Sequence, residues 1–336
     1  MKVRLKRLQD QVVVITGASS GIGLATARMA AARGARLVLA ARNDDALRQL
    51  VDEISAGGGR AIHVDADVGS EPDVRRIGDA ALRAFGAFDT WVNNAGVSIY
   101  GRALEIPIDD MRRLFETNFW GVIYGSRVAC EHLRTHGGAL ISVGSEVSDK
   151  AVPLQSVYSA SKHAVKGWTD ALRMELEYAR APISVTLIKP AAIDTPYTQH
   201  AKNYLPDQPK HAPPVYAPES VAEAILYAAE TPVRDLFVGG GAKFVAAMDK
   251  WAPRLGDRFV EHLIIPGTHS GRPRRGRDAL YEPGDDLRER GDYPGIVRKS
   301  IYTRAVMHPM LTGAAAVGAG LLVASLWRSS GETPRM

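Results

Sequence analysis

The sequence predicts a doubly wound α/β fold, in which helices cover both faces of a seven-stranded parallel sheet. Short β-rich runs alternate with helical patterns over the first 245 residues. Several of these runs are apolar throughout, as expected for strands that are covered on both faces. The predicted strands are residues 12–16, 36–40, 61–64, 89–92, 139–143, 183–188 and 235–238. Cap residues such as Asn43 and Ser70 mark the starts of helices between them.

Composition limits the class of protein. Hydrophobic residues make up 46% of the chain and charged residues 24%, which is ordinary for a soluble globular protein. The single cysteine, Cys130, cannot form an internal disulfide, and no His/Cys cluster has zinc spacing. We therefore expect a cytoplasmic protein without a bound metal. The net charge of +5 lies mostly after residue 250, but no known nucleic-acid-binding motif accompanies it, so we expect no nucleic-acid partner.

The first predicted strand runs directly into T-G-A-S-S-G-I-G, residues 16–23. Glycines at positions 17, 21 and 23 let backbone N–H groups approach a pyrophosphate, and the N-terminus of the following helix favours its negative charge. Tight turns also use glycines. Because a strand precedes this motif and a helix follows it, dinucleotide binding is the favoured interpretation.

A tyrosine and a lysine stand four positions apart in Y-S-A-S-K, residues 158–162. On a helix, Tyr158 and Lys162 would share one face, so the ammonium would lower the pKa of the phenol. The pair alone also fits an amphipathic helix in which a tyrosine precedes a surface lysine. The other motifs of the chain have to decide between these alternatives.

The glycine spacing G-x-x-x-G-x-G, N-N-A-G at 93–96 and Y-x-x-x-K together resemble the short-chain dehydrogenase/reductase family. The resemblance covers about residues 8–245 and implies a Rossmann-type oxidoreductase with a nicotinamide cofactor. The catalytic residues that it implies are Asn118, Ser145, Tyr158 and Lys162, with Ser142 and Ser148 as less suitable neighbours. The cofactor-binding residues that it implies are Gly17, Ser19, Ser20, Gly21, Ile22, Gly23, Arg42, Asp67, Val68, Asn94, Ala95, Gly96, Tyr158, Lys162, Ile193 and Thr195.

The resemblance also implies a role for each member of the tetrad. Tyr158 is expected to act as general acid/base on a small-molecule carbonyl or alcohol, while Ser145 hydrogen-bonds the reacting oxygen. Lys162 is expected to hold the nicotinamide ribose, and Asn118 a water that links the lysine to solvent. The rival hypothesis is a non-catalytic nucleotide-binding sensor or scaffold on the same fold, against which the complete tetrad argues.

The end of the second strand bears on the choice between NAD(H) and NADP(H). This stretch reads L-A-A-R-N, with Ala41 where NAD-preferring members commonly carry an acidic residue and Arg42 next. A guanidinium binds phosphate through paired hydrogen bonds, so Arg42 suits the 2′-phosphate. The alternative is a solvated surface arginine. We expect NADP(H) to be preferred over NAD(H).

Two features that follow the sixth predicted strand bear on the substrate-binding part of the site. Ala191 stands where the family commonly has glycine, a change that would cost about a kcal/mol if the residue needs positive φ and nothing otherwise. Residues 197–216 are expected to form a flexible substrate lid. Its histidines, His200 and His211, are expected to be solvated loop residues rather than catalysts.

Beyond residue 245 the pattern changes, and we divide the chain into a domain over 1–245, a linker over 246–309 and a hydrophobic helix over 310–328. The linker contains an apolar stripe at Trp251, Leu255, Phe259 and Leu263, then an irregular or disordered stretch over 266–295. The hydrophobic helix is a candidate membrane anchor, and the alternative is a small-residue helix that packs on the domain.

The family resemblance also bears on assembly. It implies a homo-oligomer, such as a dimer, in which the helices carrying Asn118 and Tyr158 pack against their symmetry mates. The apolar residues of those helices supply enough surface for such contact. The alternative is that this surface is buried against the chain's own sheet.

Overall fold

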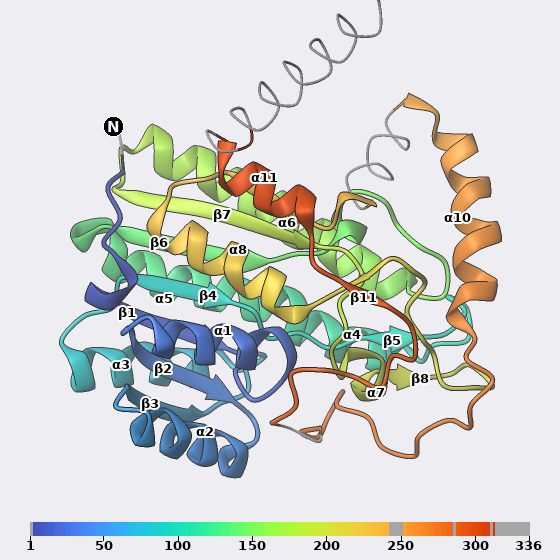
Figure 1. Cartoon of the computed structure of the whole chain (residues 1–336), viewed down its shortest axis with the longest axis horizontal. Coiled ribbons are helices and arrows are strands. Elements are labelled where there is room, and N and C mark those ends of the chain that lie inside the picture. The colour runs from blue at the N-terminus through green and yellow to red at the C-terminus, as the bar shows by residue number, and fades with distance from the viewer. Residues whose placement is uncertain (1–2, 242–250, 285–286, 310–311, 313–336) are drawn as a thin grey trace, which may run out of the picture.

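The chain folds around a seven-stranded parallel sheet in the order β10-β7-β6-β4-β1-β2-β3, with helices on both faces (Figure 1). The computed structural model describes residues 3–241, 251–284, 287–309 and 312. The strands are β1 (Val12–Thr16), β2 (Arg36–Ala41), β3 (Arg60–Asp65), β4 (Thr90–Asn93), β6 (Gly138–Val143), β7 (Ile183–Pro190) and β10 (Asp235–Val238). The predicted fold class and all seven predicted strands are confirmed, with small shifts at the strand ends.

Alternate residues of the central strand β1 enter two separate cores. Val13 and Ile15 pack in the cluster that contains the apolar faces of α1, α2 and α8. Val12 and Val14 pack in the cluster on the other side, with α3, α5 and α6. Because both faces are covered, this strand is apolar at every position except its last. The helices are α1 (Gly21–Ala32), α2 (Asp44–Ala56), α3 (Glu71–Phe85), α5 (Gly121–His136), α6 (Ser156–Tyr178) and α8 (Pro218–Glu230).

The sequence did not predict two small parallel sheets beside the main one. In the first, β5 (Ile99–Tyr100) pairs with β8 (Lys202–Asn203), directly after the short helix α7 (Tyr197–His200). In the second, β9 (Val215–Tyr216) pairs with β11 (Val297–Arg298) from the C-terminal extension. Strands of two residues carry too little periodicity to be recognised in a sequence. The first sheet fixes the expected substrate lid to the domain near its start, and the second joins the end of the lid to the C-terminal extension.

The C-terminal extension contains two described helices, α10 (Pro253–Thr268) and α11 (Ile301–Met307). Between α10 and β11, the described chain is irregular and runs along the carboxyl end of the sheet (Figure 1). Helix α11 returns to the domain and packs on α8 and β10. The extension therefore lies against the edge at which parallel α/β sheets bind ligands.

The apolar stripe predicted after residue 245 is real, but it faces outward. Trp251, Leu255, Phe259 and Leu263 are all exposed, Trp251 to 83%. None of the helices within the described ranges combines the length and apolar character needed to cross a bilayer. The predicted hydrophobic helix over 310–328 lies outside the described residues, apart from Thr312.

The turn between β1 and α1 requires glycine for steric reasons. Gly17 has φ +67°, and a Cβ added at Gly23 would lie 2.0 Å from the carbonyl oxygen of Gly17. Helix α1 therefore starts in direct backbone contact with the end of β1. The turn is compact because no side chain separates these two segments.

We expect Gly23→Ala to lower the free energy of unfolding by about 3 kcal/mol, at the upper end of the cost of overpacking, because a backbone oxygen blocks the methyl group. The matched control is Gly276→Ala, since a Cβ at this exposed position meets nothing within 4 Å. Chemical denaturation of both variants checks the prediction. Equal stability of the two would contradict it.

Candidate active site

A cavity of about 290 Å³ lies along the carboxyl ends of β1, β2, β4, β6 and β7. Every predicted catalytic and cofactor-binding residue lines this cavity, except Gly23 and Asn118. The strand order reverses between β4 and β1, and a doubly wound sheet binds its ligand at this point. The structure thus brings together residues that are almost 180 positions apart in the sequence.

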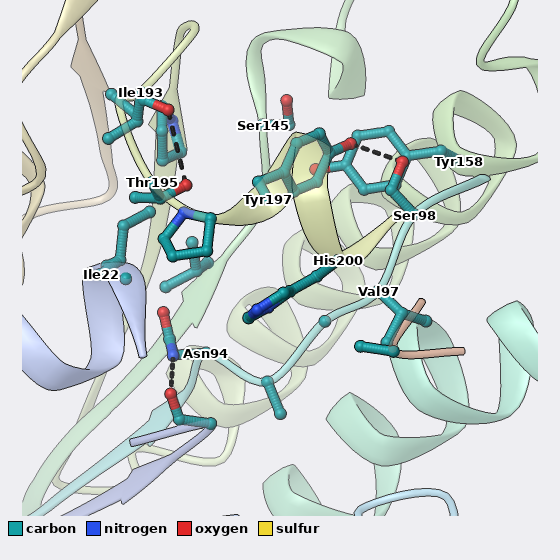
Figure 2. Close-up of a pocket in the computed structure, with 18 of the residues that line it drawn as sticks. Ile22, Asn94, Val97, Ser98, Ser145, Tyr158, Ile193, Thr195, Tyr197 and His200 are labelled. Atoms are coloured by element: carbon teal, nitrogen blue, oxygen red, sulfur yellow. Dashed lines mark hydrogen bonds between the residues drawn. The ribbon is translucent and has the colours of Figure 1, made fainter. Parts of the chain in front are cut away.

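The glycine turn forms one wall of this cavity, and Figure 2 shows Ile22 and Asn94 beside it. Gly17 approaches the end of β4 so closely that a Cβ would lie 2.7 Å from the Cα of Ala95. The Asn94 side chain donates to the backbone oxygens of Thr16 and Gly17, at 2.9 and 3.2 Å, and holds the turn in place. Ser20, the N-cap of α1, makes no side-chain cap bond. A narrow backbone cradle at a helix N-terminus fits a pyrophosphate.

The other end of the cavity is lined by Arg42, Asp67 and Val68. Asp67 accepts a hydrogen bond from the backbone N–H of Gly69 at 2.9 Å and forms an ion pair with Arg113. The guanidinium of Arg42 donates to backbone carbonyls of the C-terminal extension. The sequence predicted neither the Arg113 contact nor the involvement of the extension.

Ser145 follows β6 and caps the short 3₁₀ helix η3 (Glu146–Ser148). Its backbone N–H donates to the hydroxyl of Ser148 at 3.1 Å, so Ser148 holds the loop that presents Ser145. Ser142 is buried within β6. Tyr158, on α6, shares a hydrogen bond with Ser145. Of the three serines, Ser145 is therefore the one placed beside the phenol.

Lys162 lies one turn after Tyr158, and its Nζ is 5.7 Å from the centre of the tyrosine ring. Nζ donates to the backbone oxygen of Val143 at 2.9 Å. Burial lowers the pKa of Lys162 to about 8, and burial also raises the pKa of Tyr158. The expectation that the pKa of Tyr158 is lowered is not met, because removal of the phenol from water is the largest influence on it.

Asn118 lies in a π-helical segment, η2 (Glu116–Trp120), between α4 (Ile108–Phe115) and α5. Its side chain accepts from the N–H of Val97 at 2.8 Å and donates to the Val97 oxygen at 2.9 Å. A Cβ at Gly96 would lie 3.4 Å from Oδ1 of Asn118 and 3.8 Å from Nζ of Lys162. The asparagine and the lysine therefore flank the same glycine, although Asn118 does not line the cavity.

Ala191 does not have a positive φ, so the departure from glycine carries no backbone strain. The space for its methyl group comes from Gly239, where a Cβ would lie 2.8 Å from the Cβ of Ala191. Gly239 itself has φ +110°. The position that requires glycine here is thus 239. Alanine at position 191 carries no energetic cost, which is the second of the two outcomes considered from the sequence.

Tyr197 was not singled out from the sequence, yet its hydroxyl reaches Tyr158. It donates to the Ser98 hydroxyl at 2.8 Å and accepts from Nε2 of Gln155 at 2.8 Å (Figure 2). It also shares a hydrogen bond with Tyr158, and the two rings lie 5.5 Å apart at 66°. Its place in the expected lid, just after Thr195 and Pro196, was the available signal in the sequence.

The two lid histidines are not solvated loop residues, and that expectation is wrong. His200 and His211 both line the cavity. The ring of His211 stacks on Tyr197 with the centroids 5.8 Å apart, and burial lowers the pKa of His211 to about 4. It is therefore neutral near pH 7. Lone histidines give no sequence signal that separates these environments, because the fold of the lid decides them.

Glu146 is a second residue that the sequence did not single out. It directly follows Ser145 and lines the same cavity. Burial raises the pKa of its carboxyl group to about 7, and its charge raises the pKa of Tyr158. A buried acidic side chain thus lies near the phenol, although in the sequence Glu146 appears as one more loop residue.

These features define a dinucleotide-binding oxidoreductase: a doubly wound sheet, a glycine turn at its switch point, and a serine, a tyrosine and a lysine at the same edge. The family model described as short chain dehydrogenase matches residues 11–205. The chain belongs to this family. The family resemblance seen in the sequence is therefore confirmed.

Relatives support this assignment. An oxidoreductase of Bacillus subtilis, YxnA, is 51% identical over 327 residues, which is 96% of this chain and 91% of that protein. The likeness thus extends into the C-terminal extension. The 11-beta-hydroxysteroid dehydrogenase A of Arachis hypogaea is 39% identical over 196 residues, 58% of this chain and 55% of that protein.

Solved structures agree. A short-chain dehydrogenase/reductase of Burkholderia phymatum in complex with NAD has a TM-score of 0.68 and 27% identity, and the match covers 75% of this chain and 96% of that one. A short-chain dehydrogenase of Burkholderia cenocepacia in complex with NADP has a TM-score of 0.61 and 28% identity, covering 71% and 100%. This chain is an enzyme that acts on CH–OH or C=O groups with a nicotinamide cofactor.

The raised pKa of Glu146 makes the stability of the protein depend on pH. Its pKa is about 7 in the fold and near 4.5 in the unfolded chain, so the folded state binds the proton more tightly. The contribution of Glu146 to stability is therefore full below pH 4.5 and is lost as the pH rises to about 7.

We expect Glu146→Gln to remove this loss. The melting temperature of the variant minus that of the wild type should increase between pH 5 and pH 8. The matched control is Glu177→Gln, at an exposed position of α6, which should show no such trend. Calorimetry across this pH range checks the prediction, and a constant difference for Glu146→Gln would refute the burial argument.

Proposed function

We propose that the chain is an NADP(H)-dependent oxidoreductase that interconverts a hydroxyl and a carbonyl group, with Tyr158 as general acid/base. The observation that carries the proposal is the meeting of Tyr158, Ser145 and Lys162 in the cavity that the glycine turn also lines. Hydride transfer and proton transfer have to occur close together. The residues that we propose for cofactor binding and for proton transfer line one cavity at the same edge of the sheet.

In the reduction direction, the bound nicotinamide supplies the hydride that forms the new C–H bond. Tyr158 donates its proton to the carbonyl oxygen, and the hydroxyl of Ser145 hydrogen-bonds that same oxygen. Lys162 stabilises the phenolate that remains, because its ammonium lies on the same face of α6 one turn later. In oxidation, the same phenolate removes the proton from the alcohol.

The polar surroundings of Tyr158 limit which substrates fit. Tyr197, Ser98 and Gln155 form a hydroxyl and amide network on one side of the phenol, with Glu146 and His211 also lining the cavity. A small carbonyl or alcohol with further hydrogen-bonding groups suits such walls. We propose a small-molecule substrate of that kind.

Tyr158→Phe should lower kcat by about 10²–10⁴-fold, because it removes the proton donor and leaves the ring in place. NADPH binding should stay within a few-fold of the wild type. The matched control is Tyr178→Phe, at a position on the same helix that is 94% exposed. Its activity should be unchanged.

The assay is a panel of aliphatic, aromatic and steroid ketones, followed at the nicotinamide absorbance with NADPH. Substantial turnover by Tyr158→Phe on any substrate of the wild type would remove the tyrosine from the proposal. If the wild type binds NADPH yet no member of a broad panel is turned over, the alternative of a nucleotide-binding sensor or scaffold gains support.

The preference for NADP(H) rests on the end of β2. Ala41 offers no carboxylate to a ribose 2′-hydroxyl, and Arg42 lines the cavity next to it. A guanidinium provides the charge and the paired N–H groups that a 2′-phosphate needs. Similar structures bind NAD in one case and NADP in another, so the family alone does not make this choice.

Arg42→Ala should weaken NADPH binding about 10- to 150-fold and NADH binding much less. The expected loss is that of a hydrogen-bonded charge contact, about 1.5–3 kcal/mol. Arg33→Ala, at an exposed position after α1, is the matched control. Fluorescence titration with both cofactors checks this, and an equal effect on both would show that Arg42 does not contact the 2′-phosphate.

Homo-oligomerisation stays a prediction. Helices α5 and α6 and the segment before α5 are the expected contact elements. Trp120 is 42% exposed, and Met174 on α6 is 63% exposed. These side chains leave apolar surface for a symmetry mate, as the sequence predicts for a dimer.

A further inference from the structure

The C-terminal extension crosses the dinucleotide cavity as a strap, which we define as residues 278–284 and 287–292. At one end, Ala279 N–H donates to the His200 oxygen at 2.7 Å, and Asp278 pairs with Lys202 at 3.2 Å. At the other end, Gly291 N–H donates to Oδ1 of Asp194 at 3.2 Å. The strap is thus fixed on both sides of the cavity, and Figure 1 shows this segment passing the carboxyl end of the sheet.

Leu280 anchors the strap to the domain beside Arg42 and Arg113. Its side chain is 0% exposed and packs in a cluster with Val97, Ile99, Leu114 and Val157. Its carbonyl oxygen accepts from Nε of Arg113 at 3.1 Å, and Arg113 also pairs with Asp67. The adjacent Tyr281 donates its hydroxyl to Asp110 at 2.8 Å. A buried leucine makes this attachment stronger than a surface contact.

The strap also contacts the phosphate end of the cavity. Leu287 N–H donates to the oxygen of Ser19 at 2.8 Å, and Gly21 N–H donates to the oxygen of Arg288 at 2.9 Å. Glu289 pairs with Arg28 on α1 at 2.7 Å. The extension therefore binds both sides of the glycine turn as well as the end of β2.

The contact with Arg42 is the most informative of these. Nη2 of Arg42 donates to the carbonyl oxygens of Ala279 and Glu282, at 2.6 and 3.2 Å. Nη1 donates to those of Leu280 and Tyr281, at 3.3 and 3.0 Å. The 2′-phosphate of NADP(H) would need the same N–H groups, and a guanidinium has only a fixed fork of five donors.

We propose that the strap determines cofactor selectivity, because the carbonyl groups of residues 279–282 compete with the 2′-phosphate of NADP(H) for Arg42. This inference rests on the proposed function, in which Arg42 contacts that phosphate. Either dinucleotide has to displace the Arg288 oxygen from the N–H of Gly21. NADP(H) also has to displace the carbonyl groups from Arg42, whereas NAD(H), with a hydroxyl at the same place, does not. The strap thus reduces the preference for NADP(H) that Arg42 alone would give.

The test loosens the strap by Leu280→Ala in the full-length protein. The dissociation constants of NADPH and NADH are measured by fluorescence titration. The ratio Kd(NADH)/Kd(NADPH) should rise at least about tenfold, because a docked strap without its buried leucine competes less well. Leu255→Ala, on the exposed face of α10, is the matched control, and its ratio should equal that of the wild type.

A double-mutant cycle then tests whether the effect of Leu280→Ala on cofactor selectivity requires Arg42. In an Arg42→Ala background, Leu280→Ala should change the ratio less than twofold, because the shared partner is gone. An equal change in both dissociation constants, or a tenfold change that persists without Arg42, would overturn the inference. If Leu280→Ala does not fold, the double variant Tyr281→Phe/Glu289→Gln replaces it, with an expected rise of about threefold and the same contradicting outcomes.

Measurements on Arg42→Ala distinguish failure of the proposed phosphate contact from failure of the proposed competition by the strap. If Arg42→Ala alone leaves NADPH binding unchanged, the 2′-phosphate contact of the proposed function is wrong, and the strap inference falls with it. If Arg42→Ala weakens NADPH binding as expected but the cycle shows no coupling, the strap inference alone is wrong.

Discussion

The close approach of the β1–α1 turn to the end of β4 is the constraint on which the site depends. Gly17 lies against Ala95, Gly23 lies against Gly17, and Asn94 ties the two segments together. A side chain at either glycine would push the strand end and the helix apart. The cradle for the pyrophosphate follows from this contact, and Arg42 and Tyr158 line the same cavity.

Around Tyr158, burial shifts the pKa values of the ionisable side chains. Removal from water lowers the pKa of Lys162 and raises those of Tyr158 and Glu146, so three ionisable groups sit where small changes of environment move protons. Of these groups, Tyr158 is connected to the lid through its hydrogen bond with Tyr197.

The sequence predicted the sheet, the glycine turn and the Tyr158–Lys162 pair on one helix, because these depend on local patterns: apolar runs, glycines after a strand, and a tyrosine one helical turn before a lysine. It did not predict Tyr197, His211 or the strap. Those depend on how irregular segments fold back over the domain, and irregular segments carry no periodicity. The direction of the pKa shift of Tyr158 was missed for a related reason, since pairing is visible in a sequence and burial is not.

The central claim is that the carboxyl edge of the sheet binds a nicotinamide dinucleotide along the glycine turn. Hydrogen exchange of the backbone amides, measured with and without NADPH, tests it most directly. The account predicts that NADPH slows exchange at residues 17–23 and 94–96, which line the cradle. Unchanged exchange at both segments, with protection elsewhere, would contradict it.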